Sequence, residues 1–232
     1  MWLGTNSGLK SWDGYDFHNF RSTAFSPGIL PNNTVLSITE DNNKILWLGT
    51  RNGLARFDMK TRSFNTLFIE GDSYRTIYTL YTSTDGTVWI GTDGGLTRYD
   101  EKTHKFDTYS EKNSIYLDSD GKKSADRHIS VKSIIDDGHG NLYLGTWSDG
   151  VLIFNPKKRT FQRYEKINNF NSAYSLHLDS KGRLWIGSWS EGLQMIPNPE
   201  QGPRAEHLNI SINATGFNTF YKIIEDPISH QI

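Results

Sequence analysis

The 232-residue sequence predicts an all-β protein, a β-propeller built of four-stranded antiparallel blades. A first observation is a repeated frame, in which an aromatic residue precedes an apolar residue, a glycine and a threonine or serine. The five aromatic residues are Trp2, Trp47, Trp89, Tyr143 and Trp185, at spacings of 45, 42, 54 and 42 residues. A second observation is that the chain between these markers reads as short β segments, four to a unit, bounded by turn residues. A period of roughly 40–50 residues with four strands per unit is typical of a propeller blade.

The second repeat shows the predicted strands most clearly. We expect strands at residues 34–40, 45–50, 54–58 and 63–68, joined by the turns DNNK, RNG and MKTR. The last turn follows a pattern shared by FDMKTRSF, YDEKTHKF and FNPKKRTF, in which Asp or Asn can accept backbone hydrogen bonds. No stretch of a dozen residues has a clean helical period. The glycine of the frame is expected to let neighbouring blades approach, and the aromatic residues to fill the space between sheets.

The repeats make residues 1–232 a single propeller segment with five repeats that begin near the aromatic markers. Residues 221–232 align without gaps on residues 131–142, so the sequence ends one residue before its next marker. It also starts, after Met1, on a marker. Either the five blades close, with the last inner strand completing the first blade, or the chain is a piece of a larger ring. We expect the piece, and a parent ring of seven blades.

Composition argues against several classes of protein. The chain has 25 basic and 26 acidic residues and a formal net charge of -1, so nothing favours nucleic acid or an anionic membrane as a partner. No apolar run reaches 18 residues, so we predict no membrane span in this chain, and its start lacks a signal-peptide pattern. There is no cysteine, and the seven histidines show no zinc spacing. We therefore predict no metal and no cofactor.

The repeated string resembles the two-component regulator propeller repeat. It is nearly whole from Asp85 to Phe106, DGTVWIGTDGGLTRYDEKTHKF, and it recurs with small departures in all five units. In this family such repeats form the sensor region, outside the cytoplasm, of hybrid two-component systems that are common in gut Bacteroidetes. There, two propellers and an immunoglobulin-like domain precede a membrane span and a histidine kinase.

The resemblance has several implications for this chain. It implies a periplasmic location, signal transduction and the sensing of oligosaccharides. The implied partners are the remaining blades, the second propeller and the immunoglobulin-like domain of a parent receptor, and a second copy in a homodimer. The kinase is not part of this sequence.

Two copies of the frame differ from the others. GTWSDG at residues 145–150 and GSWSEG at residues 187–192 place three residues, the first a tryptophan, where GTNSGL, GTRNGL and GTDGGL place two. Antiparallel alternation brings both loops to one face of neighbouring blades. The long 54-residue spacing is expected to bring a polar insertion loop, residues 110–130, to the same face. Loops on a rigid scaffold are where binding residues concentrate.

A tryptophan beside a carboxylate indicates sugar recognition. The indole can stack on the apolar C–H face of a pyranose, and the carboxylate can accept hydrogen bonds from sugar hydroxyls. Residues that enter the first strands from this face, Asn171 among them, could add polar contacts. The candidate ligand-binding residues are Trp147, Asp149, Trp189, Glu191, Tyr74, Arg75, Arg127 and His128. The alternative is structural, with the tryptophans packed between blades and the acids closing turns.

Three functions fit the predicted fold, because a fold alone does not choose among them. The first is a non-catalytic ligand-sensing module of a hybrid two-component sensor, favoured by the repeat string and the altered loops. The second is a propeller enzyme, either a streptogramin-type lyase or a glycosidase that uses Asp149 and Glu191 as paired carboxylates. The third is a protein-interaction scaffold, which predicts an exposed apolar patch and no pocket.

Overall fold

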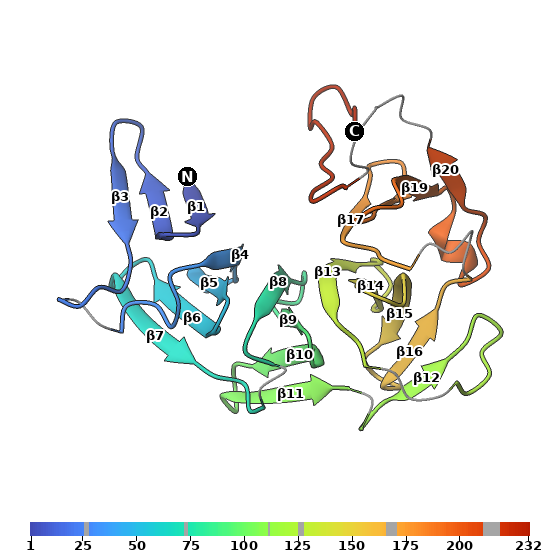
Figure 1. Ribbon diagram of the computed structural model, residues 1–232, viewed down its shortest axis with the longest axis horizontal. Coiled ribbons are helices and arrows are strands. Elements are labelled where there is room, and N and C mark those ends of the chain that lie inside the picture. Colours follow the sequence, from blue (N-terminus) through green and yellow to red (C-terminus); the bar gives the residue numbers. More distant parts are fainter. Residues whose placement is uncertain (26–27, 72–73, 111, 125–127, 166–170, 211–218) are drawn as a thin grey trace. The chain divides into compact units, whose positions relative to one another are not determined.

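The structure is a computed structural model that describes residues 1–25, 28–71, 74–110, 112–124, 128–165, 171–210 and 219–232. The chain forms two compact units, Met1–Thr108 and Tyr109–Ile232. Within the described residues the regular structure is β-strand, apart from the short 3₁₀-helix η2 at Pro199–Gln201, so the predicted all-β class is confirmed (Figure 1). None of the helices in this part of the chain is long and apolar enough to cross a membrane.

The first unit contains three sheets (Figure 1). The first sheet has three strands, in the order β1-β2-β3, and the other two have four, in the orders β4-β5-β6-β7 and β8-β9-β10-β11. The strand pairs β1–β2, β2–β3, β4–β5, β5–β6, β6–β7, β8–β9 and β9–β10 are antiparallel. The strands are β1 Trp2–Thr5, β2 Gly8–Trp12, β3 Phe17–Phe20, β4 Val35–Glu40, β5 Ile45–Thr50, β6 Gly53–Asp58, β7 Ser63–Leu67, β8 Ile77–Thr82, β9 Val88–Thr92, β10 Gly95–Asp100 and β11 Lys105–Tyr109, the last of which ends in the second unit.

The second unit contains two sheets. One has five strands in the order β12-β16-β15-β14-β13, and the other has four in the order β17-β18-β19-β20. Each four-stranded set is the antiparallel blade that the repeat predicts. The strands are β12 Ile115–Leu117, β13 Val131–Asp136, β14 Leu142–Thr146, β15 Val151–Asn155, β16 Thr160–Arg163, β17 Ser175–Leu178, β18 Leu184–Gly187, β19 Leu193–Ile196 and β20 Leu208–Ile210.

The threonine or serine of the repeated frame closes one hairpin in each sheet, between β1 and β2 in the first sheet and between the second and third strands of the blade in the others. Its hydroxyl donates to the carbonyl oxygen of the glycine that begins, or precedes, the later strand of the hairpin, at 2.7 Å for Thr50 and Gly53 and 2.8 Å for Thr146 and Gly150. The threonine hydroxyl oxygen also accepts a backbone N–H from within the loop. In the two-residue loop after Thr50, the donor is the Asn52 N–H. The bond pair is the same for two-residue and three-residue loops, so loop length can change without loss of the hairpin.

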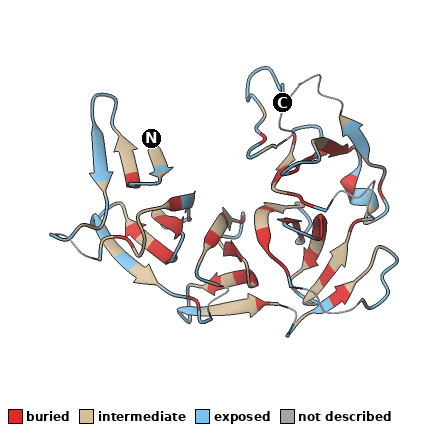
Figure 2. Cartoon of the chain, in the orientation of Figure 1, coloured by how far each residue is buried: buried red, intermediate tan, exposed pale blue. Residues whose placement is uncertain are grey.

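Aromatic markers and frame glycines set the distance between neighbouring sheets. Trp47 is fully buried, and its indole N–H donates to the Asp41 carboxylate at 2.7 Å. A Cβ on Gly49 would lie 2.3 Å from Ser37 Oγ and 2.6 Å from Ile77 Cγ2, which is closer than real contacts allow. The buried residues lie along the strands within each unit (Figure 2). The frame glycine is therefore required by the close approach of the next sheet.

A β-bulge follows the first residue of the inner strand in three sheets. The register shifts between Val35 and Ser37, and it shifts in the same way in β8 and β13. The residues inside the shifts are Leu36, Tyr78 and Lys132. A bulge re-aims one side chain relative to strict alternation. The sequence pattern did not predict these bulges.

The insertion at residues 110–130 was predicted to be a loop, and this is wrong for part of its length. Strand β12 lies inside it and pairs in parallel with β16, with the Ile115 N–H donating to the Arg159 carbonyl at 3.0 Å. Tyr116 stacks on Phe161 with ring centroids 5.1 Å apart. The open edge of β16 offers unpaired backbone groups, and the Ile-Tyr-Leu segment has the β-propensity to pair with them.

The gapless alignment of residues 221–232 on residues 131–142 is also wrong, by one residue. The Phe220 N–H donates to the Ser188 carbonyl at 2.9 Å, as the Ala173 N–H donates to the Thr146 carbonyl at 2.8 Å one blade earlier. Phe220 therefore holds the position that the alignment gave to Tyr221. The shift is absorbed in the following turn, because the Asp226 N–H reaches the Gln231 carbonyl, one residue farther along than in the earlier turns.

We predict that Gly49→Ala lowers the free energy of unfolding by about 1–3 kcal/mol, because the methyl group forces two packed sheets apart. The measurement is urea unfolding. Asn52→Ala, at an exposed position in the same hairpin, is the control and should change stability by less than about 0.5 kcal/mol. Equal stability of Gly49→Ala and the wild type would contradict the close packing of the two sheets.

Asp179 is predicted to make stability depend on pH. Burial of the carboxyl group opposes ionisation, but hydrogen bonds from the Trp185 indole and from Arg183 outweigh it and hold the pKa of Asp179 below its ordinary value. A carboxyl group with a depressed folded pKa contributes stability above its unfolded pKa of about 4 and loses it as the pH falls through the folded pKa. Asp179→Asn should therefore cost about 1–3 kcal/mol at pH 7 and less in acid. Thermal unfolding from pH 7 to pH 3 measures it, and a pH-independent difference would contradict the assignment.

Candidate functional site

Four aromatic side chains of the second unit form a connected group, which we call the aromatic cluster: Trp147, Tyr174, Trp189 and Tyr221. The ring centroids of Trp147 and Trp189 lie 5.5 Å apart at an interplanar angle of 59°. Tyr174 lies 6.3 Å from Trp147 and 5.5 Å from Trp189, and Tyr221 meets Trp189 edge-on at 5.5 Å. Tilted and edge-on rings hold one another in place.

The cluster is exposed although its rings are in contact. The exposed fraction is 44% for Trp147, 40% for Trp189 and 62% for Tyr221, while Tyr174 is half-buried. Burial, with Tyr221 nearby, raises the pKa of Tyr174 above its ordinary value, so its hydroxyl stays protonated at neutral pH. A rigid group of rings with free faces can stack against a ligand without first ordering itself.

The hairpin bond of the repeat places Trp147 and Trp189 at the ends of their strands. In the first altered loop, the Asp149 N–H donates to Thr146 Oγ1 at 2.9 Å. In the second, the Glu191 N–H donates to Ser188 Oγ at 2.6 Å. The extra residue of each loop is accommodated while the hairpin stays closed, so the indole lies at the surface.

The two acids of the altered loops have different surroundings. Asp149 is only 4% exposed. Glu191 is exposed, and its carboxylate accepts the Asn171 N–H at 3.2 Å and the Ser172 hydroxyl at 2.9 Å, so it holds the chain that enters β17 of its own sheet. The structural role expected of these acids is therefore present for Glu191. Contact of either acid with a ligand stays a prediction.

For the other predicted ligand-binding residues, the described part of the structure shows no contact with the aromatic cluster. Tyr74 and Arg75 belong to the first unit. Tyr74 packs against Gly94, whose added Cβ would lie 2.7 Å from its ring, and the Arg75 carbonyl accepts the Gly53 N–H at 2.7 Å. His128 is exposed, and Arg127 lies outside the described residues.

Sequence reasoning missed three residues at this site: Lys132, Tyr174 and Tyr221. Lys132 is the bulge residue of β13, and its Nζ lies 5.8 Å from the Trp147 ring centroid, within cation–π distance. Tyr174 is its counterpart in the next sheet. A signal was available for two of them, because Lys132 and Tyr174 hold equivalent repeat positions, each just before a serine that pairs with the frame glycine. The bulge at Lys132 has no sequence signature.

In the described part of the chain, no group of three His, Asp or Glu side chains lies close enough together to hold a metal ion. His207, which is half-buried near Tyr164, has its pKa lowered by burial.

A family model supports the repeat assignment. The model of the two component regulator propeller matches residues 29–52, 71–94 and 169–190. These three segments of the chain match the two-component regulator propeller repeat. No curated protein matches it at a significant level.

Solved structures similar to this propeller chain include extracellular domains. The extracellular domain of BT4673 from B. thetaiotaomicron, described as a hybrid two component system, has a TM-score of 0.65 and 22% identity over 97% of this chain and 34% of that chain. The extracellular domain of BT3049, which has the same description and organism, has a TM-score of 0.57 and 20% identity over 97% of this chain and 36% of that chain. Virginiamycin B lyase from Staphylococcus aureus has a TM-score of 0.58 and 14% identity over 77% of this chain and 56% of the lyase chain. The chain thus spans about a third of the two Bacteroides domains, and these identities show a shared fold.

We predict that Glu191→Ala loosens the altered loop of this propeller without unfolding the chain. The variant removes the acceptor of the Ser172 N–H and hydroxyl bonds, and the same hydroxyl accepts the Trp189 N–H at 3.1 Å. Amide hydrogen exchange at Ser172 and Trp189 should become faster, by about tenfold for a loss of 1.4 kcal/mol. Ser190→Ala in the same loop is the control. Unchanged exchange in Glu191→Ala would refute the role given to Glu191.

Proposed function

We propose that this chain is the ligand-binding part of an extracytoplasmic sensor propeller, and that it binds an oligosaccharide at the aromatic cluster without catalysing a reaction. The observation that carries the proposal is the exposure of Trp147 and Trp189, which contact each other on two loops that depart from the repeat, together with the exposed Tyr221 beside Trp189. A repeat protein has no structural need to change its loops at neighbouring blades in the same way. The cluster therefore has the character of a binding surface.

The chemistry of the cluster suits a sugar. A pyranose ring presents an apolar C–H face to an aromatic ring and hydroxyl groups to polar neighbours. The tyrosine hydroxyls of Tyr174 and Tyr221 and the ammonium group of Lys132 supply hydrogen-bond donors beside the rings. The 59° angle between the Trp147 and Trp189 rings suits a chain of sugars that bends between two stacking positions better than a single flat ligand.

The sensor assignment is supported by the repeat family and by the extracellular Bacteroides domains with the same fold. In this proposal the chain lies in the periplasm and belongs to a longer receptor with further blades, a second propeller, an immunoglobulin-like domain and a second copy. Binding would signal by favouring one arrangement of these parts, since a ligand shifts an equilibrium only by its differential affinity for two states.

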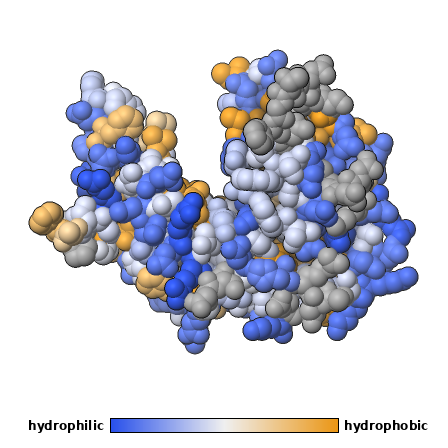
Figure 3. All heavy atoms as spheres, viewed as in Figure 1, coloured by the Kyte–Doolittle hydropathy of each residue, from blue (hydrophilic) through white to orange (hydrophobic). Residues whose placement is uncertain are grey.

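Enzyme and scaffold functions have less support in the described residues. The Glu191 carboxylate is engaged by Asn171 and Ser172, which leaves it a poor partner for Asp149 in paired acid–base catalysis. The likeness to virginiamycin B lyase is one of fold. On the face drawn in Figure 3, hydrophobic residues form separate patches among hydrophilic ones, unlike the broad apolar surface expected of a scaffold.

The test is a binding screen against neutral and acidic oligosaccharides of plant, host and microbial origin. A ligand that binds only the folded state raises the apparent unfolding temperature. We expect at least one oligosaccharide to do so, and the double variant Trp147→Ala/Trp189→Ala to bind it at least about tenfold more weakly, since each stacking contact is worth on the order of 1 kcal/mol.

The control is Tyr15→Ala, an equally conspicuous aromatic residue, 89% exposed, on the β2–β3 turn. It should bind like the wild type. Undiminished binding by the double tryptophan variant would move the site elsewhere. The absence of binding by any oligosaccharide to a folded sample would overturn carbohydrate recognition by this chain.

A further inference from the structure

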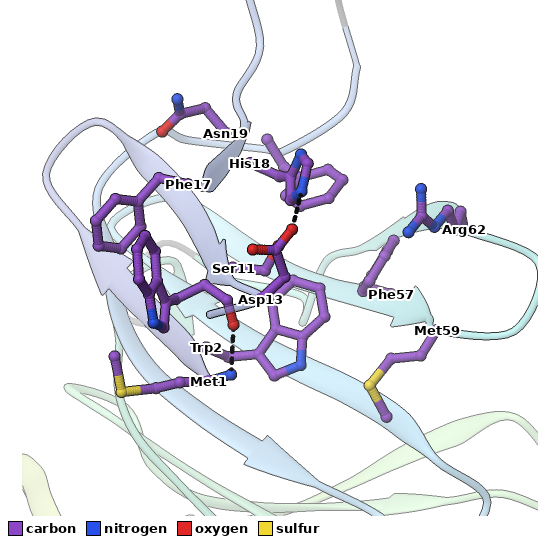
Figure 4. A pocket seen from close by; sticks show the side chains of 12 residues that line it. Met1, Trp2, Ser11, Asp13, Phe17, His18, Asn19, Phe57, Met59 and Arg62 are labelled. Atoms are coloured by element: carbon purple, nitrogen blue, oxygen red, sulfur yellow. Dashed lines mark hydrogen bonds and ion pairs between the residues drawn. The ribbon is translucent and has the colours of Figure 1, made fainter. Parts of the chain in front are cut away.

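A pocket of about 650 Å³ lies in the first unit between the sheet of β1–β3 and the sheet of β4–β7. Its walls come from Trp2, Ser11 and His18 of the first sheet and from Phe57, Met59 and Arg62 of the second (Figure 4). The aromatic cluster, by contrast, is a feature of the second unit. The pocket is therefore a separate candidate site.

The pocket exists because one repeat position carries a short side chain. Trp2 pairs with Ser11 across the first sheet, as Trp47 pairs with Arg56 across the second. The residues at the same register in the remaining sheets are Arg98, Ile153 and Met195. Four of the five sheets thus fill this position with a long side chain, and the first sheet has a serine.

The filled counterpart shows what fits beside the marker tryptophan. The guanidinium carbon of Arg56 lies 4.7 Å from the Trp47 ring centroid, so a planar group lies over the indole. Its nitrogens donate to Tyr99 Oη at 3.5 Å and to the Glu101 carboxylate at 2.9 Å. The equivalent space beside Trp2 has room for a planar group from outside the chain.

The charge of the pocket differs from that of its counterpart. In the repeat alignment, Phe57 stands where Tyr99 is, Met59 where Glu101 is, and Arg62 where His104 is. The two partners of a guanidinium group have become apolar, and a cation has been added at the rim. Arg62 and His104 both have positive φ, 55° and 54°, so they occupy the same turn position.

The remaining acid at the pocket is already engaged. Asp13 lies 2.9 Å from His18 Nε2, and it also accepts the backbone N–H groups of Tyr15 and Asp16 at 2.9 Å. A cationic ligand would have to compete with His18 for this carboxylate. An anionic ligand would meet Arg62 without that competition.

Apolar walls complete the site. The Trp2 ring lies 5.4 Å from Phe57 in a T-shaped arrangement and 5.8 Å from Phe20, and Phe20 lies 5.4 Å from Phe57. These three rings, with the Met59 thioether, are well suited to a flat hydrophobic ring. A purely polar planar group would leave them poorly covered.

We infer that the pocket beside Trp2 binds a small aromatic carboxylate, with its planar ring over the Trp2 indole and its carboxylate at the Arg62 guanidinium. The ring takes the place that the Arg56 side chain fills in the next sheet. The ion pair selects against neutral and cationic analogues.

The test uses three probes that share one ring and differ in charge: phenylacetate, phenylacetamide and phenethylamine. Binding to the intact chain is measured by ligand-observed NMR and isothermal titration. We expect phenylacetate to bind most tightly and phenethylamine most weakly. Arg62→Gln should reduce the preference for phenylacetate over phenylacetamide by roughly tenfold, the effect of losing one charge-assisted hydrogen bond.

The decisive variant is Ser11→Arg, which restores the side chain found at position 56. It should fill the pocket and abolish binding of phenylacetate while the chain stays folded. Ser7→Arg, at an exposed position in the β1–β2 turn, adds the same charge outside the pocket and should bind like the wild type.

Three results would overturn the inference. They are absence of phenylacetate binding to the wild type, binding that survives in a folded Ser11→Arg variant, and equal affinity for the three probes. If Ser11→Arg fails to fold, Ser11→Leu provides the same test with a smaller, uncharged side chain. None of these results depends on the oligosaccharide site, since that site is probed by different variants and ligands.

Discussion

The hydroxyl-to-carbonyl bond across each central hairpin is the contact on which the rest of this structure depends. It joins the threonine or serine of the repeated frame to the glycine at the start of the third strand, at 2.7 Å in the second sheet and 3.0 Å in the last. The bond tolerates two or three residues between its ends. Natural variation in these loops can therefore add a surface tryptophan while the sheet beneath keeps its register.

The space between sheets is a second place where one frame supports different chemistry. The marker tryptophan, fully buried in the second sheet and half-buried in the last, donates its indole N–H to an aspartate from the turn after the inner strand in both. Beside it, one position of the middle strand is filled by Arg56 in one sheet and left short by Ser11 in another. The marker tryptophan and the frame glycine set the packing between sheets. The residue at the neighbouring position can therefore be short, which leaves space for a pocket.

Much of the fold could be predicted from the sequence because the repeat is periodic. The four strands of the second repeat were placed within about one residue of their ends, since alternation and turn residues there are local signals. The strand in the 110–130 insertion was missed, because its partner β16 lies some forty residues away in the chain. The one-residue shift at Phe220 was missed because inter-sheet hydrogen bonds, and not sequence similarity, set the register there.

For the candidate sites, the sequence by itself determined that two loops differ from the repeat and that each carries a tryptophan and an acid. Only the tertiary structure decided that the two indoles touch, that Tyr174 and Tyr221 join them, and that Glu191 is bonded to the neighbouring strand entry. The physical reason is that bulges and inter-sheet contacts re-aim side chains by distances that no local pattern encodes. The pocket beside Trp2 has the same origin, because a serine becomes informative only when the facing sheet is known.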